Sequence, residues 1–569
     1  MNGKVHALMI FAAVASFVSC NVKTSTSESY NKPELKSTMQ TLLTDSTMNV
    51  DSVIFAAYEQ RDFQPLWIDD KGFTEAFNVF FAELSAVETH GLAPQKMNLY
   101  KETLFMERIK QNADIQEDSL ALFDYFTTVN FLNYCRTLSF GLLNPKNHRL
   151  TNYYFDVKTA DADFEKYCLN QIDKDFEDFL KKLTPSSPAY IALQKTRQYY
   201  VTLQDSVLEN IPLTPEKQPL KYGDTSAIIP LIAKRLLLTQ EISQTDADSA
   251  LHYQKFDSLL LKSVGIFQQK RGLFVDNEIG VNTIKALNVS FKDLIKTVDV
   301  NLERMRWQPS IAVNDKYIRV NVANQTLAAW HADSLALWMK TVVGEPPDHL
   351  TPFLHSNIYD IVLNPLWNVP KRIIVEEIAL KAAEKANYIT RNKMKVYRAG
   401  ILVNHDSIDW TKISDKYSPY NVVQDAGNGN ALGRIKFNFR NSFAVYLHDT
   451  NAKSAFGRHR RAISHGCVRV EQPYKLAWFC LPTASAEKTT LMKDKILFST
   501  ERTPITENGK KLAKDNPKAL TITNVSIKPN IPVLLEYYTC YVNENNDVTF
   551  CNDVYNIDNE LYEKLVISD

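Results

Sequence analysis

The 569-residue sequence has no excess of charge of either sign, because Lys and Arg together number 65 and so do Asp and Glu. A nucleic-acid-binding protein normally needs a basic surface to neutralise phosphates, so this balance argues against a nucleic-acid partner. Beyond residue 20 the sequence also lacks an uninterrupted apolar run of about 18 residues, which a transmembrane helix needs. Internal repeats and long low-complexity runs are absent as well. These absences favour a soluble chain after residue 20, and its length predicts about three or four domains.

The first twenty residues differ from the rest of the chain. Lys4 precedes an apolar stretch from Ala7 to Val18, which is too short to span a membrane and is typical of a secretion signal. The stretch ends in Phe-Val-Ser-Cys20, which resembles a lipobox, where the cysteine is acylated after cleavage. We therefore expect a signal peptide of the lipoprotein type at 1–20, lipidation of Cys20 and a flexible tether at 21–34. A plain cleaved signal followed by an incidental cysteine is the alternative.

Hydrophobic periodicity divides the rest of the chain into a helical and a β-rich part. Apolar residues recur every three or four positions from 35 to 215 and from 216 to 290, which predicts amphipathic helices, and a connecting helix is expected at 291–310. From Tyr317 onward the period changes to two, which predicts strands. The predicted strands are 318–322, 327–330, 335–343, 356–363, 434–439 and 444–448.

Two further segments complete this interpretation. Residues 371–398 have a helical pattern and mark an insertion at about 371–430 within a β-rich unit at 316–500. Residues 501–569 are expected to form a C-terminal β-rich segment. The sequence therefore predicts a multidomain α+β chain, in which helical domains precede a β-rich domain that carries a helical insertion.

The sharpest local signal is His448 followed, after 15 residues, by Ser464-His465-Gly466-Cys467. A nucleophilic cysteine needs a nearby base or cation to hold it as thiolate, and histidine does this best near neutral pH. Glycine before the cysteine lets the backbone approach a substrate carbonyl, and the neighbouring N–H groups can receive an oxyanion. A structural cysteine beside a histidine is the alternative. A zinc site formed by His448, His465 and Cys467 lacks a second cysteine at suitable spacing, so we predict neither a metal nor a cofactor.

The same residues resemble the signature of the YkuD-type L,D-transpeptidases. Segments 364–370, 429–437 and 445–450 are similar to the large YcbB-like branch of that family, except that 424–428 lacks the prolines usual there. Upstream, 63–67 and 90–92 are similar to the helical scaffold domain of that branch. The unit around 267–287 resembles a three-helix peptidoglycan-binding domain, and 301–307 its exit helix. The resemblance implies a scaffold domain at 35–215, a peptidoglycan-binding domain at 216–290 and a catalytic domain at 316–500.

The resemblance also implies roles for individual residues. Cys467 would be the nucleophile and His448 its general base, oriented by Asp449 or by a backbone carbonyl. His465 and Gly466 would shape the oxyanion hole through their backbone, with Ser464 packed beside them. The candidate substrate contacts are Arg469, Trp367, Asn430 and Gly433, where Arg469 would bind a carboxylate or form a structural ion pair.

The implied reaction begins when Cys467 attacks the carbonyl of the third residue of a peptidoglycan stem peptide and releases the terminal D-alanine. An amine of a second stem then resolves the thioester and forms a 3→3 cross-link. Water as acceptor would make the enzyme an L,D-carboxypeptidase, and a non-catalytic wall-binding protein is the alternative from another class. The expected location is the cell envelope, on the periplasmic side, with a membrane contact through the lipid anchor.

Two cysteines near the C-terminus suggest a disulfide. Segments 536–542 and 548–551 are rich in β-branched and aromatic residues, and Asn545-Asn546 between them suits a two-residue hairpin turn. That turn would place Cys540 directly opposite Cys551, within reach of a bridge in an oxidising compartment. Two free thiols stacked across the hairpin are the alternative.

Overall fold

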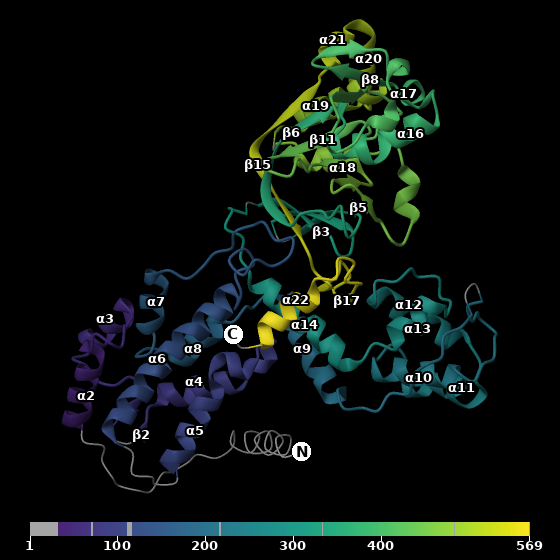
Figure 1. Ribbon diagram of the computed structural model, residues 1–569. Helices are drawn as coiled ribbons and strands as arrows, with labels where there is room; N and C mark the ends of the chain where they lie inside the picture. The colour runs from purple at the N-terminus through teal and green to yellow at the C-terminus, as the bar shows by residue number, and fades with distance from the viewer. Residues whose placement is uncertain are drawn as a thin grey trace.

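The computed structural model describes residues 32–69, 72–110, 116–215, 218–313, 315–332, 334–482 and 484–567. The predicted signal peptide, Cys20 and nearly all of the tether lie outside these residues. Helical parts form one end of the molecule and a β-rich domain the other (Figure 1). The predicted multidomain α+β organisation is therefore confirmed. Among the described helices, none combines the length and the apolar character needed to cross a membrane.

The N-terminal helical region is organised by Asp124, a buried residue of the long helix α6. Its carboxylate accepts the backbone N–H groups of Leu66 (3.0 Å) and Trp67 (2.7 Å) and the hydroxyl of Tyr58 (2.6 Å). Burial raises the pKa of Asp124 to about 6, and the three donors offset the loss of hydration. The helices are α2 (Lys32–Thr44), α3 (Ser52–Gln60), α4 (Glu75–Ser85), α5 (Leu99–Lys110), α6 (Glu117–Phe140), α7 (Ala162–Leu169), α8 (Phe176–Leu183) and α9 (Pro188–Leu203).

A second helical unit has a hydrophobic core of its own, formed by residues between Ile211 and Leu287. Buried Gln268 donates its amide to the Asp276 side chain (2.7 Å) and to the Glu278 carbonyl (2.9 Å), which fixes the loop between its last two helices. Figure 1 shows this unit on the side away from the N-terminal region. Its helices are α10 (Ile229–Leu238), α11 (Gln244–Tyr253), α12 (Ser258–Lys270) and α13 (Val281–Leu287), followed by α14 (Phe291–Arg306).

Helix α14 connects the helical parts to the β-rich domain through two buried arginines. Arg306 pairs with Glu303 (2.6 Å) and donates to the carbonyl of His90 (2.7 Å) in the N-terminal region. Arg304 pairs with Asp558 (2.7 Å) close to the C-terminus. Because a buried charge without a partner is costly, these pairs hold α14 to the N-terminal region and to the C-terminal end of the chain.

The β-rich domain contains a nine-stranded sheet in the order β13-β5-β14-β12-β11-β6-β15-β3-β4. Since β4 also pairs with β5, all strands except β13 close into a barrel-like ring without a free edge. The strands β12 and β14 are parallel neighbours, as are β3 and β15. The strands are β3 (Lys316–Asn321), β4 (Thr326–His331), β5 (Ser334–Gly344), β6 (Leu354–Leu363), β11 (Ile435–Phe439), β12 (Leu447–His448), β13 (Ala462–Ser464), β14 (Val468–Val470) and β15 (Asn524–Glu536).

The insertion, which we define as residues 367–424, has a separate small core and a four-stranded sheet in the order β7-β10-β8-β9. Its first part is helical, as predicted, but the prediction was wrong for residues 394–398, which form strand β8. Pairing of β8 with β10 stabilises this strand, and β10 lies too far along the chain to be visible in a local pattern. The elements are β7 (Trp367–Asn368), α15 (Lys371–Ile373), η3 (Ile374–Ile378), α16 (Ala379–Glu384), α17 (Tyr388–Arg391), β8 (Met394–Arg398), β9 (Ile401–Val403) and β10 (Tyr420–Gln424).

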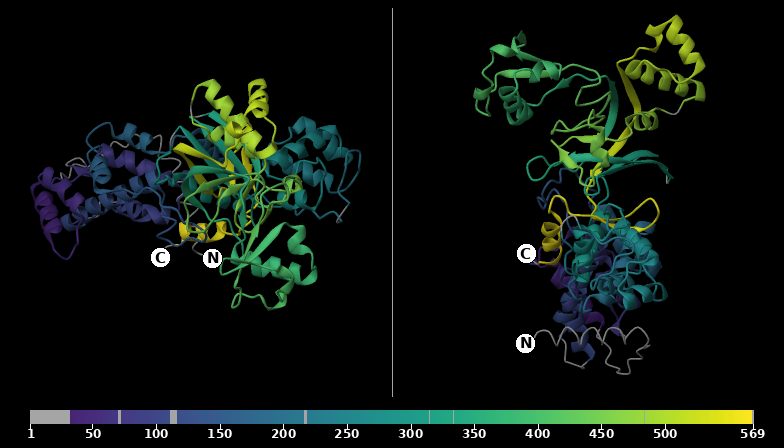
Figure 2. Two further views of the ribbon diagram at one scale, coloured as in Figure 1. Left: turned by 90° about the horizontal axis from the view of Figure 1, so that it is seen from above. Right: turned by 90° about the vertical axis from the view of Figure 1, so that its right-hand side faces the viewer.

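The C-terminal segment is more helical than the predicted β-rich 501–569. Its long strand β15 pairs with β3 and β6 and therefore belongs to the barrel, whereas helices precede and follow it. Figure 2 shows α19–α21 and the insertion on opposite sides of the β-rich domain. The helices are α18 (Pro473–Cys480), α19 (Ala486–Glu501), α20 (Glu507–Asp515), α21 (Pro517–Leu520) and α22 (Asp558–Val566).

The predicted hairpin near the C-terminus is present, but the predicted disulfide is wrong. Strands β16 (Cys540–Val542) and β17 (Val548–Phe550) pair with Cys540 opposite Phe550, and both Cys540 and Cys551 are free thiols. The connection spans residues 543–547, with Asn546 at φ 65°, so the register differs by one residue from that of a two-residue turn. A shift by one residue turns Cys551 to the face opposite Cys540.

Candidate active site

The turn that carries Cys467 is held by a short chain of hydrogen bonds. Gly466 has φ 106°, a conformation that favours glycine, and its carbonyl accepts the hydroxyl of Thr351 (2.9 Å). Ser464 donates its hydroxyl to the carbonyl of Cys467 (2.6 Å) and accepts the N–H of Gly466 (3.2 Å). Ser464 therefore closes the turn, and the Gly466 amide already has a partner within it.

Strand pairing brings the predicted nucleophile and base to one face of the barrel sheet. The parallel strands β12 and β14 pair Leu447 with Val468 and His448 with Arg469. Because side chains alternate along a strand, His448 and Arg469 point to the same side of the sheet. Tyr446 and half-buried Cys467, which stand two residues before His448 and Arg469, point to that side as well. The arrangement of Cys467 and His448 follows from the register of two neighbouring strands.

His448 is buried and held by the backbone. Its Nδ1 contacts the carbonyl oxygen of Asp449, which can only accept, so that nitrogen carries the proton of the neutral ring. Burial, with smaller effects of the nearby cations Arg469 and Lys436, lowers the pKa of His448 to about 3, while backbone hydrogen bonds to Asp449 and Leu432 oppose the shift. His448 is therefore a neutral imidazole at physiological pH, oriented by a backbone carbonyl.

The Asp449 side chain points away from this imidazole. It accepts the backbone N–H of Arg434 (2.8 Å) and pairs with Lys453. Gly433 lies against it, since a Cβ on Gly433 would come within 2.3 Å of the carboxylate. Of the two ways considered to orient His448, the structure shows the carbonyl, and Gly433 lies against the Asp449 carboxylate.

Asn430 is buried, and its amide is used within the protein. It donates to the carbonyls of Pro365 (3.1 Å) and Asp425 (3.0 Å), and its oxygen accepts the N–H of Leu432 (2.8 Å). Leu432 in turn bonds to His448 through its backbone. Asn430 thus positions the loop behind the imidazole.

Two residues of the site, Tyr446 and Lys436, were not predicted from the sequence. The hydroxyl of Tyr446 hydrogen-bonds to Cys467 and interacts with the side chain of Trp367, at the start of the insertion. The ammonium of Lys436 lies 4.0 Å from the centre of the Tyr446 ring. Tyr446 stands two positions before His448, so the two-residue period of a strand could have predicted that both side chains lie on one face. Lys436 lies on β11 and becomes a neighbour of His448 only because β11 pairs with β12.

The thiol of Cys467 is protonated in the resting site. Burial raises its pKa, although hydrogen bonds from Tyr446 and the charges of Lys436 and Arg469 act in the other direction. Arg469 is half-buried, and its electrostatic neighbours are Cys467 and Glu377 of the insertion. The resting pair is therefore a thiol and a neutral imidazole, with two cations on the same face.

The side chain of His465 points toward the insertion. Its Nε2 lies 2.7 Å from the carboxylate of Glu377, which lowers the pKa of Glu377 to about 2. Among the described residues, His448 and Cys467 belong to no group of side chains close enough to share a metal, so the zinc site considered with His465 is not formed.

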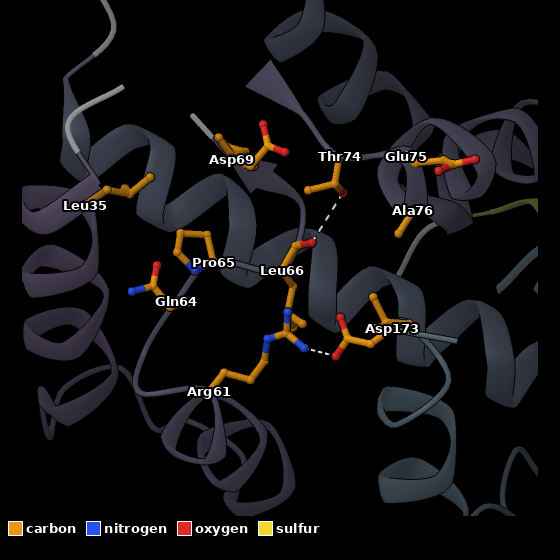
Figure 3. Close-up of a pocket in the computed structure, with 12 residues that line it drawn as sticks. Leu35, Arg61, Gln64, Pro65, Leu66, Asp69, Thr74, Glu75, Ala76 and Asp173 are labelled. Atoms are coloured by element: carbon orange, nitrogen blue, oxygen red, sulfur yellow. Dashed lines mark hydrogen bonds and ion pairs between the residues drawn. The ribbon is translucent and has the colours of Figure 1, made fainter. Parts of the chain in front are cut away.

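Two cavities lie outside the cysteine turn. One of about 550 Å³ is lined by Gly433, Asp449 and Tyr474, on the side toward which the Asp449 carboxylate points. The other, of about 440 Å³, lies in the N-terminal region, where an ion pair between Arg61 and Asp173 borders it (Figure 3). Neither is lined by Cys467 or His448.

Comparisons with known proteins identify two domains in the chain. Residues 315–492 match the family model of the YkuD L,D-transpeptidase catalytic domain, and residues 52–196 match that of the Scaffold domain. A curated protein of Haemophilus influenzae, named "Putative L,D-transpeptidase", is 32% identical over 282 residues, which are 49% of this chain and 51% of that protein. The chain thus spans about half the length of the curated relative that it matches.

Solved structures show weaker likeness. An L,D-transpeptidase from Mycobacterium smegmatis is 10% identical, with a TM-score of 0.17, over 39% of this chain and 58% of that chain. An L,D-transpeptidase from Stackebrandtia nassauensis is 12% identical, with a TM-score of 0.20, over 57% of this chain and 97% of that chain. The assignment rests on the two family models and the curated relative: the chain contains a YkuD L,D-transpeptidase catalytic domain preceded by a Scaffold domain.

Proposed function

We propose that this protein is a peptidoglycan L,D-transpeptidase that forms 3→3 cross-links between stem peptides through a thioester on Cys467. The observation that carries the proposal is the placement of Cys467 and a buried, neutral His448 on one face of two paired strands. The imidazole is oriented at Nδ1 by the Asp449 carbonyl, and Nε2 would be the proton acceptor. Such a pair is suited to acyl transfer by a cysteine.

In the first step, the Cys467 sulfur attacks the carbonyl carbon of the third stem residue while its proton passes to His448. The carbonyl oxygen becomes an oxyanion in the tetrahedral intermediate. Collapse of the intermediate breaks the amide bond, the imidazolium returns the proton to the leaving amine, and D-alanine departs. A thioester with Cys467 remains.

We assign the oxyanion donors to the N–H of Cys467 and the hydroxyl of Tyr446. The Gly466 amide is occupied by Ser464 (3.2 Å), whereas the Tyr446 hydroxyl is within hydrogen-bonding reach of the sulfur at which the tetrahedral centre forms. A fixed donor contributes several kcal/mol, about 3 for a single oxyanion-hole residue. His465 and Gly466 then support the turn, and Trp367 holds Tyr446.

Two cations of the site, Lys436 and Arg469, would link substrate binding to the basicity of His448. Burial is the main reason that His448 is a weak base in the free protein, and Arg469 and Lys436 lower its pKa further. A stem carboxylate bound between them would neutralise their effect and raise the basicity of His448 at the moment when a substrate is present. Arg469 is the better carboxylate ligand of the two, because its guanidinium can bind in a bidentate manner.

In the second step, the amine of a neighbouring stem attacks the thioester and Cys467 leaves as thiol. The net change is one amide bond broken and one formed. Attack by water instead gives a free carboxylate, which is the L,D-carboxypeptidase alternative. The rest of the chain fits this role if residues 216–290 bind peptidoglycan and residues 1–20 direct the protein to the cell envelope, where acylated Cys20 would anchor it.

Incubation of the full chain with purified muropeptides, followed by mass spectrometry, tests the proposal. We expect a dimer that carries a 3→3 link and free D-alanine. A tripeptide without dimer would establish hydrolysis, and the recovery of unchanged muropeptides would favour a wall-binding protein. Omitting the acceptor stem is the control, since only hydrolysis continues without it.

Removal of the insertion is expected to weaken stem binding without destroying the thiol site. The N–H of Val369 donates to the carbonyl of Val422 (2.9 Å), so the two ends of the insertion are adjacent and residues 370–421 can be replaced by a short linker. The insertion has a core of its own, so the barrel keeps its packing. We expect the KM for the stem to rise about tenfold.

The measurement is a comparison of KM and of iodoacetamide labelling of Cys467 in the two proteins. Labelling should stay within a factor of two or three of the full-length value. An unchanged KM would show that the insertion does not contact the stem.

A further inference from the structure

Two histidines and a glutamate meet next to the cysteine turn without taking part in the chemistry described above. The rings of His349 and His465 lie 4.5 Å apart in an edge-to-face arrangement, and His349 Nε2 lies 3.5 Å from Glu376 Oε2. One nitrogen from each histidine and one carboxylate oxygen all fall within 4.8 Å of one another. These three side chains come from distant parts of the sequence.

The three residues belong to separate elements of the fold. His349 stands in the loop between β5 and β6, His465 in the turn before Cys467, and Glu376 in η3, a stretch of π-helix in the insertion. Segments of π-helix are rare and occur frequently at functional sites. Here the wider turn lets two consecutive glutamates reach the histidine pair, because Glu376 faces His349 and Glu377 contacts His465.

The glutamate is also held from behind. Arg372 donates to Glu376 Oε1 (2.6 Å) and to the carbonyl of Asp348 (2.8 Å), the residue before His349. The other oxygen, Oε2, is the one that faces His349. Such outer partners orient the ligands in metal sites of proteins.

The distances suit a transition metal. Zinc lies about 2.1 Å from nitrogen and oxygen ligands, which places tetrahedral ligands about 3.4 Å apart. The observed 3.5 Å between His349 and Glu376 matches that spacing, and the partly exposed side chains allow the third ligand to close in by rotation.

We propose that His349, Glu376 and His465 form a binding site for a zinc-class divalent ion, with water as the fourth ligand. Two imidazoles and one carboxylate are a ligand set that zinc accepts readily. Bound there, the ion joins the insertion to the turn two residues before the nucleophile. It thereby holds the insertion against the site in a fixed position, a task that the Glu377–His465 pair performs in its absence.

Equilibrium dialysis of Zn²⁺ against the untagged full chain, after treatment with EDTA, measures the site directly. The Cys467→Ala background removes the thiolate as a competing ligand. We expect about one ion per chain at pH 7.5, and an affinity about 100-fold lower in His349→Ala and at least 10-fold lower in Arg372→Ala. His252→Ala, which changes an exposed histidine of α11, is the matched control and should bind as the parent does.

Two further measurements distinguish this site from zinc binding by a cysteine thiolate. Co²⁺ bound to the chain with Cys467 intact should show a spectrum without a thiolate charge-transfer band, because the ligands are nitrogen and oxygen. Zn²⁺ should slow hydrogen exchange at 374–378 and 463–467 in the parent and not in His349→Ala. Undiminished binding by His349→Ala, or a thiolate band, would overturn the proposal, whatever the transpeptidase activity proves to be.

Discussion

Replacing Cys467 by alanine is expected to reduce the release of D-alanine and the formation of dimer to background, a loss on the order of 10⁴-fold or more. The reason is that no other described thiol lies on the face of His448, since Cys135, Cys168, Cys480 and Cys540 are buried elsewhere. Without the sulfur, Tyr446 and His448 have no acyl group to stabilise. The measurement is the initial rate of D-alanine release from a stem tetrapeptide.

The fold should survive this change, because Cys467 is half-buried and alanine fits within its space. A thermal unfolding midpoint within a few degrees of the parent confirms this. Cys551→Ser is the matched control, since Cys551 is the other half-buried thiol among the described residues and directly follows strand β17. Dimer formation by a folded Cys467→Ala protein would refute the thioester mechanism.

The cysteine turn was predictable because its information is local. Gly466 has a positive φ, Ser464 closes the turn through its own neighbours, and Cys467 follows directly. His448 could be assigned from the same motif, while its orientation could not, because it depends on a carbonyl and a burial that only the folded strands provide.

The sequence could not predict which residues of other strands contribute to the site. Lys436 faces His448 because β11 pairs with β12, and a shift of one residue would have turned it away. The same physics explains the error at Cys540. A connection of five residues instead of two changes the register by one, and the two short strands do not alternate strictly enough to distinguish the two registers.

The insertion shows where local periodicity misleads. Residues 394–398 follow two short helices and read as their continuation, but β10 pairs with them from more than twenty residues away. Likewise, Glu376 and Glu377 look like ordinary exposed charges on a helix, and their approach to the histidines depends on the π-helical turn and on how the insertion docks.

Replacing His448 by alanine is expected to slow acylation of Cys467 by a factor on the order of 10² or more near pH 7. In the parent, His448 is neutral at any pH well above its pKa of about 3, and Cys467 is protonated below its raised pKa. Both reactive forms therefore coexist across the neutral range, and the parent's rate should be nearly independent of pH there.

The variant should behave differently, because it has no internal base and must react as free thiolate. The thiolate fraction rises about tenfold per pH unit below the thiol pKa, so the variant's rate should climb with pH and the deficit should shrink. The ratio of the parent's acylation rate to that of the variant is thus largest near pH 5 and smallest near pH 10. Intact-mass measurement of labelling by a carbapenem-type acylating probe, from pH 5 to 10, records both profiles.

His465→Ala distinguishes the two histidines of the motif. Its side chain contacts Glu377 of the insertion, and alanine leaves the backbone of the turn in place, so the parent's pH-independent profile should persist. His459→Ala, an exposed histidine beyond η6 (Lys453–Gly457), controls for the loss of a histidine as such. If His448→Ala labels at the parent's rate and His465→Ala acquires the rising profile, the base is His465, and the neutral pair described here is not the reacting one.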